Sequence, residues 1–304
     1  MKATTQTPGR VVANYGRRVL IQDTAGNRHL CIPKGRKLGI VCGDQALWRP
    51  AQQSEDLGVV EQVLPRSTTL ERPNTRGRVE VLAANITQLL IVICHKPPLD
   101  PYLVDRYIVA AELMGIKSRI LWNKVDLLDH DTKSVFGNTL EEFQAIGYDI
   151  LEISAKQKVG LKRLAEVLRN ETSILVGQSG VGKSSLLNAL IPNIDVATKE
   201  ISEANKEGKH TTTTAVWYDL AISGSIIDSP GIRDYTPAPV EQSKIAIGFR
   251  EFDSAPPCRF NNCSHLREPG CGVQEWVEKG LISERRFESY RRLCNIMNKL
   301  QSRT

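Results

Sequence analysis

The stretch TSILVGQSGVGKSSLLNAL, residues 172–190, decides the fold because a glycine-rich turn joins a strand pattern to a helix pattern. Residues 172–176 are a short apolar run, and residues 181–190 have the apolar spacing of a helix. Between them, residues 177–184 fit the phosphate-loop pattern G-x-x-x-x-G-K-S in full. Glycines let backbone N–H groups close around phosphate oxygens, and the helix N-terminus adds partial positive charge. The stretch therefore predicts a nucleotide-phosphate site on a sheet of the α/β class.

The phosphate loop supplies most of the candidate binding residues. We expect Lys183 to reach the β and γ phosphates and to act in catalysis, and the Ser184 hydroxyl to bind Mg²⁺. The loop alone does not distinguish ATP from GTP. The full predicted set in this loop is Gly177, Gln178, Ser179, Gly180, Val181, Gly182, Lys183, Ser184 and Ser185.

Asn123-Lys124-Val125-Asp126, which follows an apolar strand pattern, makes the distinction between the two bases. Guanine presents two neighbouring donors, N1–H and the 2-amino group, and one carboxylate can accept both. Asp126 is therefore the predicted guanine reader. Asn123 is expected to brace the base and the surrounding loops, while the aliphatic stem of Lys124 covers the face of the base.

A second base-reading element, Ser154-Ala155-Lys156, follows the next strand pattern. Ala155 is expected to offer its backbone N–H to the guanine O6, and Lys156 to pack near the ribose or the base. Four residues such as 123–126 recur by chance, but two such elements in this arrangement indicate GTP and GDP as the ligands.

Asp228-Ser229-Pro230-Gly231 ends an apolar strand, residues 225–227. Asp228 is expected to hold a water of the Mg²⁺ shell, and the Gly231 N–H to sense the γ-phosphate. Ile232 occupies the place where many GTPases have the glutamine that orients water. An isoleucine cannot do this, so slow intrinsic turnover is expected.

The stretch His210-Thr211-Thr212-Thr213-Thr214, after the charged residues 203–209, has the composition of a switch loop. We expect Thr212 to complete the Mg²⁺ shell and His210 to orient the attacking water. The alternative for His210 is a loop histidine that binds backbone or an RNA phosphate.

The order of these elements is rotated relative to an ordinary small GTPase, in which the phosphate loop comes first. Here the base-reading elements precede it, which indicates a circular permutation. The permutation places the γ-phosphate sensor beside a Cys/His cluster, so residues 233–250 are expected to couple the two. Shortening or loosening residues 233–250 is expected to weaken the GTP hydrolysis that a binding partner stimulates more than it weakens GTP binding.

Cys258, Cys263, His265 and Cys271 offer three thiolates and one imidazole within a short segment. Cys₃His is a known structural zinc set, and four protein ligands leave no open coordination position. The alternative is a group of reduced, unrelated cysteines. We expect one structural Zn²⁺ that supplies much of the folding free energy of a small module.

Charge is distributed unevenly along the 304 residues, whose net charge is +6. Residues 1–76 carry 12 Lys+Arg and 6 Asp+Glu, residues 77–239 carry 17 and 20, and residues 240–304 carry 11 and 8. Basic ends around an acidic centre favour a polyanionic partner such as RNA, although solubilising charge would give the same imbalance. The chain starts without an apolar leader, and its longest apolar run, residues 89–94, is too short to span a bilayer, so a cytoplasmic location is expected.

Three domains are expected, with boundaries at 1–70, 71–240 and 241–304. Five short strand patterns between residues 10 and 70 indicate an all-β barrel of the OB kind, with an SH3-like barrel as the alternative. Residues 66–78 have the composition of a linker. From residue 79, strands alternate with helices at 100–115, 139–147 and 161–169, which predicts a mainly parallel, doubly wound sheet. A small α-helical domain, ending in a helix over 283–300, follows.

Taken together, these motifs resemble the circularly permuted bacterial GTPases called RsgA or YjeQ. The resemblance also rests on GVVEQVLPR at 58–66, GKHTTT at 208–213 and DSPGIR at 228–233, and it covers nearly the whole chain. It implies an OB-fold that contacts 16S rRNA, a permuted GTPase core and a zinc domain. Family members act late in maturation of the 30S subunit, which stimulates their slow GTPase. A hydrophobic residue such as Ile232 is usual in the family, whereas some members carry a second histidine at Thr214.

The resemblance further implies a monomer that binds GTP or GDP, Mg²⁺ and Zn²⁺, with neither membrane nor DNA as a partner. Two rival functions remain at this point. One is a passive RNA-binding module whose nucleotide only stabilises the fold, and the other is a GTPase that serves tRNA or translation.

Overall fold

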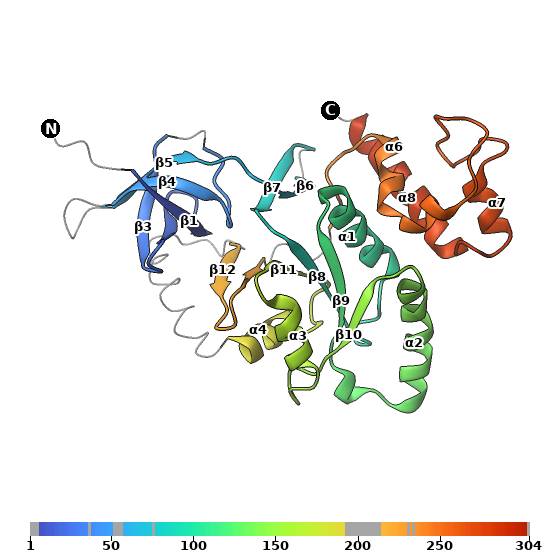
Figure 1. Ribbon diagram of the computed structural model, residues 1–304, viewed down its shortest axis with the longest axis horizontal. Coiled ribbons are helices and arrows are strands. Elements are labelled where there is room, and N and C mark those ends of the chain that lie inside the picture. The colour runs from blue at the N-terminus through green and yellow to red at the C-terminus, as the bar shows by residue number, and fades with distance from the viewer. Residues whose placement is uncertain are drawn as a thin grey trace.

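The computed structural model arranges the chain in three side-by-side parts, a barrel, a central sheet with helices, and a helical C-terminal part (Figure 1). It describes residues 6–35, 38–50, 57–74, 77–191, 214–229, 232 and 235–302.

The barrel has the closed strand order β1-β2-β3-β5-β4 and back to β1. Four of these pairings are antiparallel, and β3 pairs with β5 in parallel. This topology confirms the OB barrel over the SH3-like alternative. Val11, Ile21 and Val60 are fully buried inside it. The strands are β1 Thr7–Asn14, β2 Val19–Asp23, β3 Arg28–Pro33, β4 Gln45–Arg49 and β5 Gly58–Val63.

The central sheet has the order β10-β9-β8-β11-β13-β12, and only β12 runs antiparallel to its neighbour within this order. The predicted mainly parallel sheet is confirmed. Because Ala13 of β1 pairs with Val216 of β12, the barrel and the central sheet form one continuous hydrogen-bonded sheet. The strands are β8 Gln88–Ile93, β9 Lys117–Trp122, β10 Asp149–Glu152, β11 Thr172–Val176, β12 Val216–Asp219 and β13 Ser225–Asp228.

Helices cover both faces of this sheet, and each face has its own hydrophobic cluster. α1 packs with α2 on one face, and α3 with α4 on the other, as the doubly wound pattern requires. The helices are α1 Pro101–Met114, α2 His130–Ala145, α3 Leu161–Leu168 and α4 Lys183–Leu190, with a short 3₁₀ turn η1 at Val125–Leu127.

The start of α2 was predicted too late, at residue 139 instead of His130. Its first turns are polar, and Phe136 is the buried residue one turn before Leu140 and two turns before Phe143. One apolar residue per turn gives a weak helical signal, so the sequence pattern detected only the second half.

The predicted linker at 66–78 is wrong, because it contains strand β6, Thr69–Pro73, which pairs antiparallel with β7, Val79–Ala84. Leu70 is fully buried, while Arg72 pairs with Glu80 across the hairpin at 2.7 Å. The segment has the composition of a linker because charged residues such as Arg72 occupy the strand, where they pair with charged residues of the neighbouring strand.

The C-terminal part is helical, as predicted, and its last helix α8 begins after Ser283, whose side chain accepts from the Arg286 N–H. The aromatic side chains of Phe249, Phe252 and Tyr290 form its core. Its elements are α6 Gln242–Ile245, η2 Ala246–Gly248, η3 Arg250–Ser254, α7 Gly272–Glu278 and α8 Glu284–Gln301. The domain boundaries at 70 and 240 stay a prediction.

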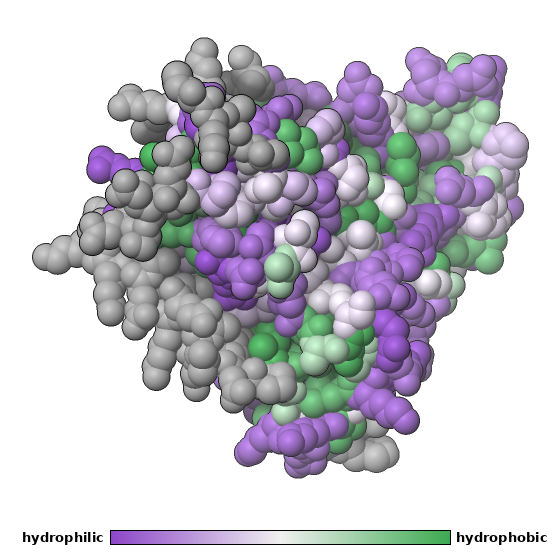
Figure 2. Space-filling model, turned by 60° about the vertical axis from the view of Figure 1, so that its left-hand side comes forward, coloured by the Kyte–Doolittle hydropathy of each residue, from purple (hydrophilic) through white to green (hydrophobic). Residues whose placement is uncertain are grey.

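Among the described residues, no helix is both long and apolar enough to cross a bilayer. On the face seen in Figure 2, hydrophilic side chains predominate, and a hydrophobic patch in the lower part of the view is accompanied by smaller hydrophobic groups above it and at the right.

Candidate nucleotide site and metal centre

The phosphate loop connects β11 to α4 and needs glycine at three positions. Gly177, Gly180 and Gly182 have φ values of 134°, 83° and 98°, which side chains rarely tolerate. Space is also lacking, because a Cβ at Gly177 would lie 2.2 Å from the Val92 carbonyl oxygen. The backbone can therefore curl tightly, as phosphate binding through N–H groups requires.

Lys183 lies inside this loop. Its Nζ donates to the carbonyl oxygens of Gly177 and Gln178, both at 2.7 Å. Ser184 follows in the first turn of α4 and is exposed. The arrangement places an ammonium group and a hydroxyl at the helix N-terminus, where a phosphate group would be stabilised.

Asp228 is the last residue of β13, which neighbours the phosphate-loop strand β11. Burial raises the pKa of this carboxyl, and the nearby Lys183 charge partly opposes that shift. The two predicted residues are therefore close enough to interact electrostatically, and a cation at this position would favour the charged carboxylate.

Asn123 joins three motifs that are far apart in sequence. Its Nδ2 donates to the Val181 carbonyl oxygen at 2.9 Å, and its Oδ1 accepts from the Ala155 N–H at 3.4 Å. The side chain is almost fully buried, at 1% exposure. Asn123 thus holds the loop at 154–156 against the phosphate loop, and its role in bracing a guanine base stays a prediction.

Lys124 lies across the same loop. It has a positive φ of 64°, and its Nζ donates to the carbonyl oxygens of Gly180 at 2.6 Å and Lys96 at 3.1 Å. Asp126 follows in the 3₁₀ turn η1 and is half-buried. The predicted guanine reader is therefore accessible at the end of β9.

The second base-reading element is anchored by Ser154, which is fully buried and whose Oγ accepts from the Gln157 N–H at 3.0 Å. Ala155 is half-buried and Lys156 exposed. The short loop after β10 therefore exposes the Lys156 side chain, whose contact with the ribose or the base stays a prediction.

Sequence reasoning missed the contribution of the loop after β8. The Lys96 carbonyl oxygen accepts from both Lys124 and the Cys94 thiol, whose pKa is raised by burial. A Cβ at Gly180 would lie 3.7 Å from Pro97. The position of this loop could have indicated its role. It follows β8, which is parallel and adjacent to the phosphate-loop strand β11, so the loops at their carboxyl ends lie side by side.

Three predicted catalytic residues, His210, Thr212 and Gly231, lie outside the described residues. Ile232 is described and is fully buried in the same hydrophobic cluster as Tyr107. Its side chain therefore packs in the core and offers no group to orient water.

The structure brings Cys258, Cys263, His265 and Cys271 together, with all four ligand atoms within 4.8 Å of one another. Cys258 Sγ lies 3.8 Å from Cys271 Sγ, and His265 Nδ1 lies 3.5 and 3.4 Å from these two sulfurs. Zinc bonds of about 2.3 Å to sulfur and about 2.0 Å to nitrogen give tetrahedral edges of about 3.8 and 3.5 Å. The donor set therefore fits one tetrahedral zinc ion.

Neighbouring groups hold this loop in place. Glu268 accepts from the Ser264 N–H and hydroxyl, and these bonds lower the pKa of its carboxyl to about 2. The Tyr290 hydroxyl of α8 donates to the Ser264 carbonyl oxygen at 2.6 Å. A Cβ at Gly272 would lie 1.8 Å from the Pro256 carbonyl oxygen, so only glycine allows the two ends of the loop to meet.

Burial shifts Cys263 and His265 toward their neutral forms. It raises the pKa of the Cys263 thiol to about 12 and lowers that of the His265 imidazole. A neutral imidazole is the form that binds zinc, whereas a zinc ion would convert the thiols to thiolates.

The phosphate loop, the two base-reading elements that precede it in sequence and the Asp228 element that follows it meet at one edge of a parallel sheet. This combination defines a circularly permuted P-loop GTPase.

Comparisons with known proteins agree with this class. The family model described as RsgA GTPase matches residues 63–237, more than half of the chain. A relative from Chromohalobacter salexigens, the small ribosomal subunit biogenesis GTPase RsgA, is 43% identical over 292 residues, which cover 94% of this chain and 85% of the relative. The protein of the same name from Yersinia pseudotuberculosis is 37% identical over 302 residues, covering 97% and 86%.

Solved structures agree as well. The crystal structure of YjeQ from Thermotoga maritima superposes with a TM-score of 0.77 at 32% identity and covers 96% of this chain and 99% of that one. YloQ, described as a circularly permuted GTPase, has the same fold, with a TM-score of 0.72 at 23% identity and 98% of both chains covered. The chain therefore belongs to the RsgA GTPase family.

Proposed function

We propose that the protein hydrolyses GTP to GDP and phosphate while bound to the small ribosomal subunit, late in the maturation of that subunit. The observation that carries this proposal is the Asn123 side chain, which joins the two base-reading loops to the phosphate loop. Relatives across nearly the whole chain are small ribosomal subunit biogenesis GTPases, which supports the choice of partner.

In the proposed reaction, a water oxygen attacks the γ-phosphorus, and the bond from that phosphorus to the β–γ bridging oxygen breaks. Lys183 and the loop N–H groups stabilise the negative charge that develops. A Mg²⁺ ion, held by Ser184, Thr212 and Asp228, would add charge neutralisation between the β and γ phosphates. The carboxyl–hydroxyl pair of Asp228 and Ser184 is the kind of oxygen donor set that Mg²⁺ prefers.

The water-positioning step is assigned to His210, with the Gly231 N–H as the γ-phosphate sensor. Support comes from the buried side chain of Ile232, which leaves the usual glutamine position without a polar group. We therefore expect slow turnover in the free protein and faster turnover on the ribosomal subunit.

The basic ends support contact with 16S rRNA, since the first 76 residues carry twice as many Lys+Arg as Asp+Glu. We propose a monomeric, cytoplasmic protein whose barrel and zinc domain bind the subunit on either side of the GTPase. One Zn²⁺ bound by Cys258, Cys263, His265 and Cys271 would be structural, because four protein ligands fill its coordination shell.

The decisive experiment compares GTP hydrolysis by the purified protein with and without 30S subunits. We expect clear stimulation by 30S, and equal rates would contradict the proposal. Co-sedimentation should show 30S binding that strengthens with a non-hydrolysable GTP analogue, together with poor affinity for 70S ribosomes. Tight 70S binding would favour a role in translation.

A Ser184→Ala variant separates the proposal from a passive RNA-binding role. We expect cells that depend on this variant to accumulate immature small subunits, because the variant would lose the Mg²⁺ ligand of the phosphate loop. A passive module would support normal maturation. Ser289→Ala, at a buried α8 position far in sequence from the loop, is the matched control.

A further inference from the structure

The proposed γ-phosphate-sensing element is the sequence 228–231, and the chain that follows it is anchored on helix α1. The Tyr107 hydroxyl donates to the Ile232 carbonyl oxygen at 3.2 Å, and the rings of Tyr107 and Tyr235 stack with centroids 5.3 Å apart. Arg106 Nη1 donates to the Thr236 hydroxyl at 3.4 Å. Tyr107 is fully buried and Tyr235 nearly so. Neighbouring α1 residues thus hold the described residues nearest to Gly231.

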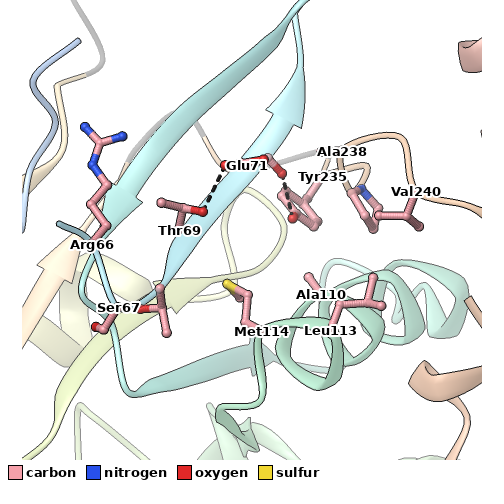
Figure 3. Close-up of a pocket in the computed structure, with 12 residues that line it drawn as sticks. Arg66, Ser67, Thr69, Glu71, Ala110, Leu113, Met114, Tyr235, Ala238 and Val240 are labelled. Atoms are coloured by element: carbon pink, nitrogen blue, oxygen red, sulfur yellow. Dashed lines mark hydrogen bonds between the residues drawn. The ribbon is translucent and has the colours of Figure 1, made fainter. Parts of the chain in front are cut away.

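Tyr235 is fixed from a second direction. Its hydroxyl donates to the Glu71 carbonyl oxygen of β6 at 2.8 Å. Figure 3 shows Tyr235 beside Glu71 of the hairpin, with Ala110, Leu113 and Met114 of α1 below them. A groove of about 350 Å³ lies between these elements. Tyr235 therefore bridges β6 and α1, and it cannot move without breaking one of these contacts.

Asp105, which precedes Arg106 and Tyr107 in α1, binds the C-terminal helix α8. Arg286 Nη1 lies 2.6 Å from Asp105 Oδ1, and Arg285 Nη1 lies 2.7 Å from Asp105 Oδ2. Asp105 and Arg286 are both fully buried. Glu251 also binds Arg286 through two hydrogen bonds of 2.7 and 3.0 Å. A buried charge network of this kind is costly to disrupt, because breaking it leaves charges without partners.

The same face of α8 reaches the metal centre. Tyr290 lies one helical turn after Arg286, and its hydroxyl donates to the carbonyl oxygen of Ser264, the residue between Cys263 and His265. Three buried contacts therefore lie between Ile232 and the metal centre: Ile232 with Tyr107, Asp105 with Arg286, and Tyr290 with Ser264. The backbones of α1 and α8 connect these contacts to one another.

We propose that Asp105, Arg106 and Tyr107 of α1 are positioning residues that couple the γ-phosphate-sensing element to the zinc domain. The proposal rests on the proposed GTPase function and specifies how the nucleotide state reaches the C-terminal domain. A displacement of Ile232 or Tyr235 would shift α1 against α8, because Tyr107 and Asp105, which make the two contacts, lie within one turn of the same rigid helix.

The test uses the full-length protein with Tyr107→Phe, which removes one hydroxyl and keeps the stacked ring. Amide hydrogen exchange is measured in residues 258–301 with GDP and with a non-hydrolysable GTP analogue. We expect the wild-type exchange rates in α8 to differ between nucleotides by at least about twofold, the lower range of typical couplings. Tyr107→Phe should bring the ratio close to one while the affinity for the GTP analogue stays within about threefold.

Tyr148→Phe is the matched control. Tyr148 is also nearly buried, and its hydroxyl bonds to Glu112 of α1 at 3.3 Å. Glu112 pairs with Arg250 of the C-terminal part and with none of the described residues Ile232, Tyr235 and Thr236, so the control touches the same domain contact without the switch end. The control should keep the wild-type ratio, and Asp105→Asn should lose it as Tyr107→Phe does. Full retention of the ratio in Tyr107→Phe, or equal loss in the control, would overturn the proposal.

The readout needs no ribosome, so it separates two failures. Wild-type protein that is not stimulated by 30S contradicts the proposed function, whereas the coupling within the molecule is decided by the exchange ratio alone. Wild-type exchange in α8 that is identical with both nucleotides contradicts the coupling.

Discussion

Gly182 is a point at which the phosphate loop packs tightly against the base-reading loop. A Cβ there would lie 2.3 Å from Asn123 Nδ2, and the backbone φ of 98° is itself unfavourable for alanine. Gly182→Ala should displace Asn123 and weaken its bond to the Val181 carbonyl. The strain of about 1–3 kcal/mol corresponds to at least a fivefold loss of GDP and GTP affinity, measurable with a fluorescent nucleotide.

Gly137→Ala provides the control for this prediction. Gly137 lies inside α2, and a Cβ there meets no atom within 4 Å. Alanine should leave nucleotide affinity unchanged and slightly stabilise the helix. If Gly182→Ala bound nucleotide as tightly as this control, the assigned loop geometry would be incorrect.

Asp44 gives a residue-scale prediction in the barrel. It is fully buried and accepts from Arg66 at 2.7 and 2.9 Å and from the Val41 N–H at 2.8 Å. Asp44→Ala would leave the Arg66 Nε–H and the Val41 N–H without their acceptor and would remove the only carboxylate bonded to Arg66 among the described residues, so we expect a loss of about 3 kcal/mol in the free energy of unfolding. Urea unfolding followed by tryptophan fluorescence would measure it.

Lys34→Ala is the comparison for Asp44. The Lys34 side chain is 64% exposed, and Glu61 retains Arg49 as a partner without it. We expect a loss below about 1 kcal/mol, as for other exposed pairs. Equal losses of unfolding free energy in the two variants would show that the buried pair of Asp44 and Arg66 stabilises the protein no more than the exposed pair of Lys34 and Glu61.

Residues whose chemistry is local could be predicted from the sequence. Lys183 and Asn123 belong to short motifs in which the neighbouring residues define the role. Tyr107 and Asp105 could not be predicted, because their partners lie 125 and 181 positions away in sequence. Only the fold shows that these two α1 side chains contact Ile232 and Arg286.

At the scale of elements, α1 has the clearest start signal. The Asp100 side chain accepts from the N–H groups of Tyr102 and Leu103, and Pro101 occupies the first turn. Both features were visible in the sequence, and the predicted limits, 100–115, coincide with the two caps of the helix. The hairpin β6–β7 lacked any such signal, because Pro73 and the charges around it are typical of loops.

Asp100→Ala should therefore cost about 1 kcal/mol in the free energy of unfolding, because two helix N–H groups lose their acceptor. Ser283→Ala, at the start of α8, should cost less, since Ser283 accepts one longer bond of 3.4 Å. Thermal unfolding of both variants would rank them. The reverse order would contradict the capping geometry.

At the scale of the whole molecule, the topology of the barrel could not be derived from strand spacing. It depends on the parallel pairing of β3 with β5, whose residues are separated by β4. The pairing of β1 with β12 likewise joins residues about 200 positions apart, for which the strand pattern gives no signal.

Zinc removal is the whole-molecule prediction. Cys263→Ser, or treatment with a strong chelator, should remove zinc and unfold the C-terminal part, because the four ligands of the metal all come from the short loop 258–271. Metal analysis combined with amide exchange in α7 and α8 would follow both events. Cys294→Ala, a buried cysteine outside the cluster, should retain one zinc per chain. Unchanged exchange in Cys263→Ser would contradict a structural metal.

The shared strand ladder between β1 and β12 also limits how the protein can be divided. Cutting the chain before residue 66 would leave β12 as the edge of the central sheet, with unpaired backbone groups, and would uncover Trp217, which now lies beneath Arg10. Open sheet edges bind one another. A GTPase fragment prepared without the barrel would therefore tend to self-associate, so truncation experiments on this chain would report aggregation as well as the loss of a domain.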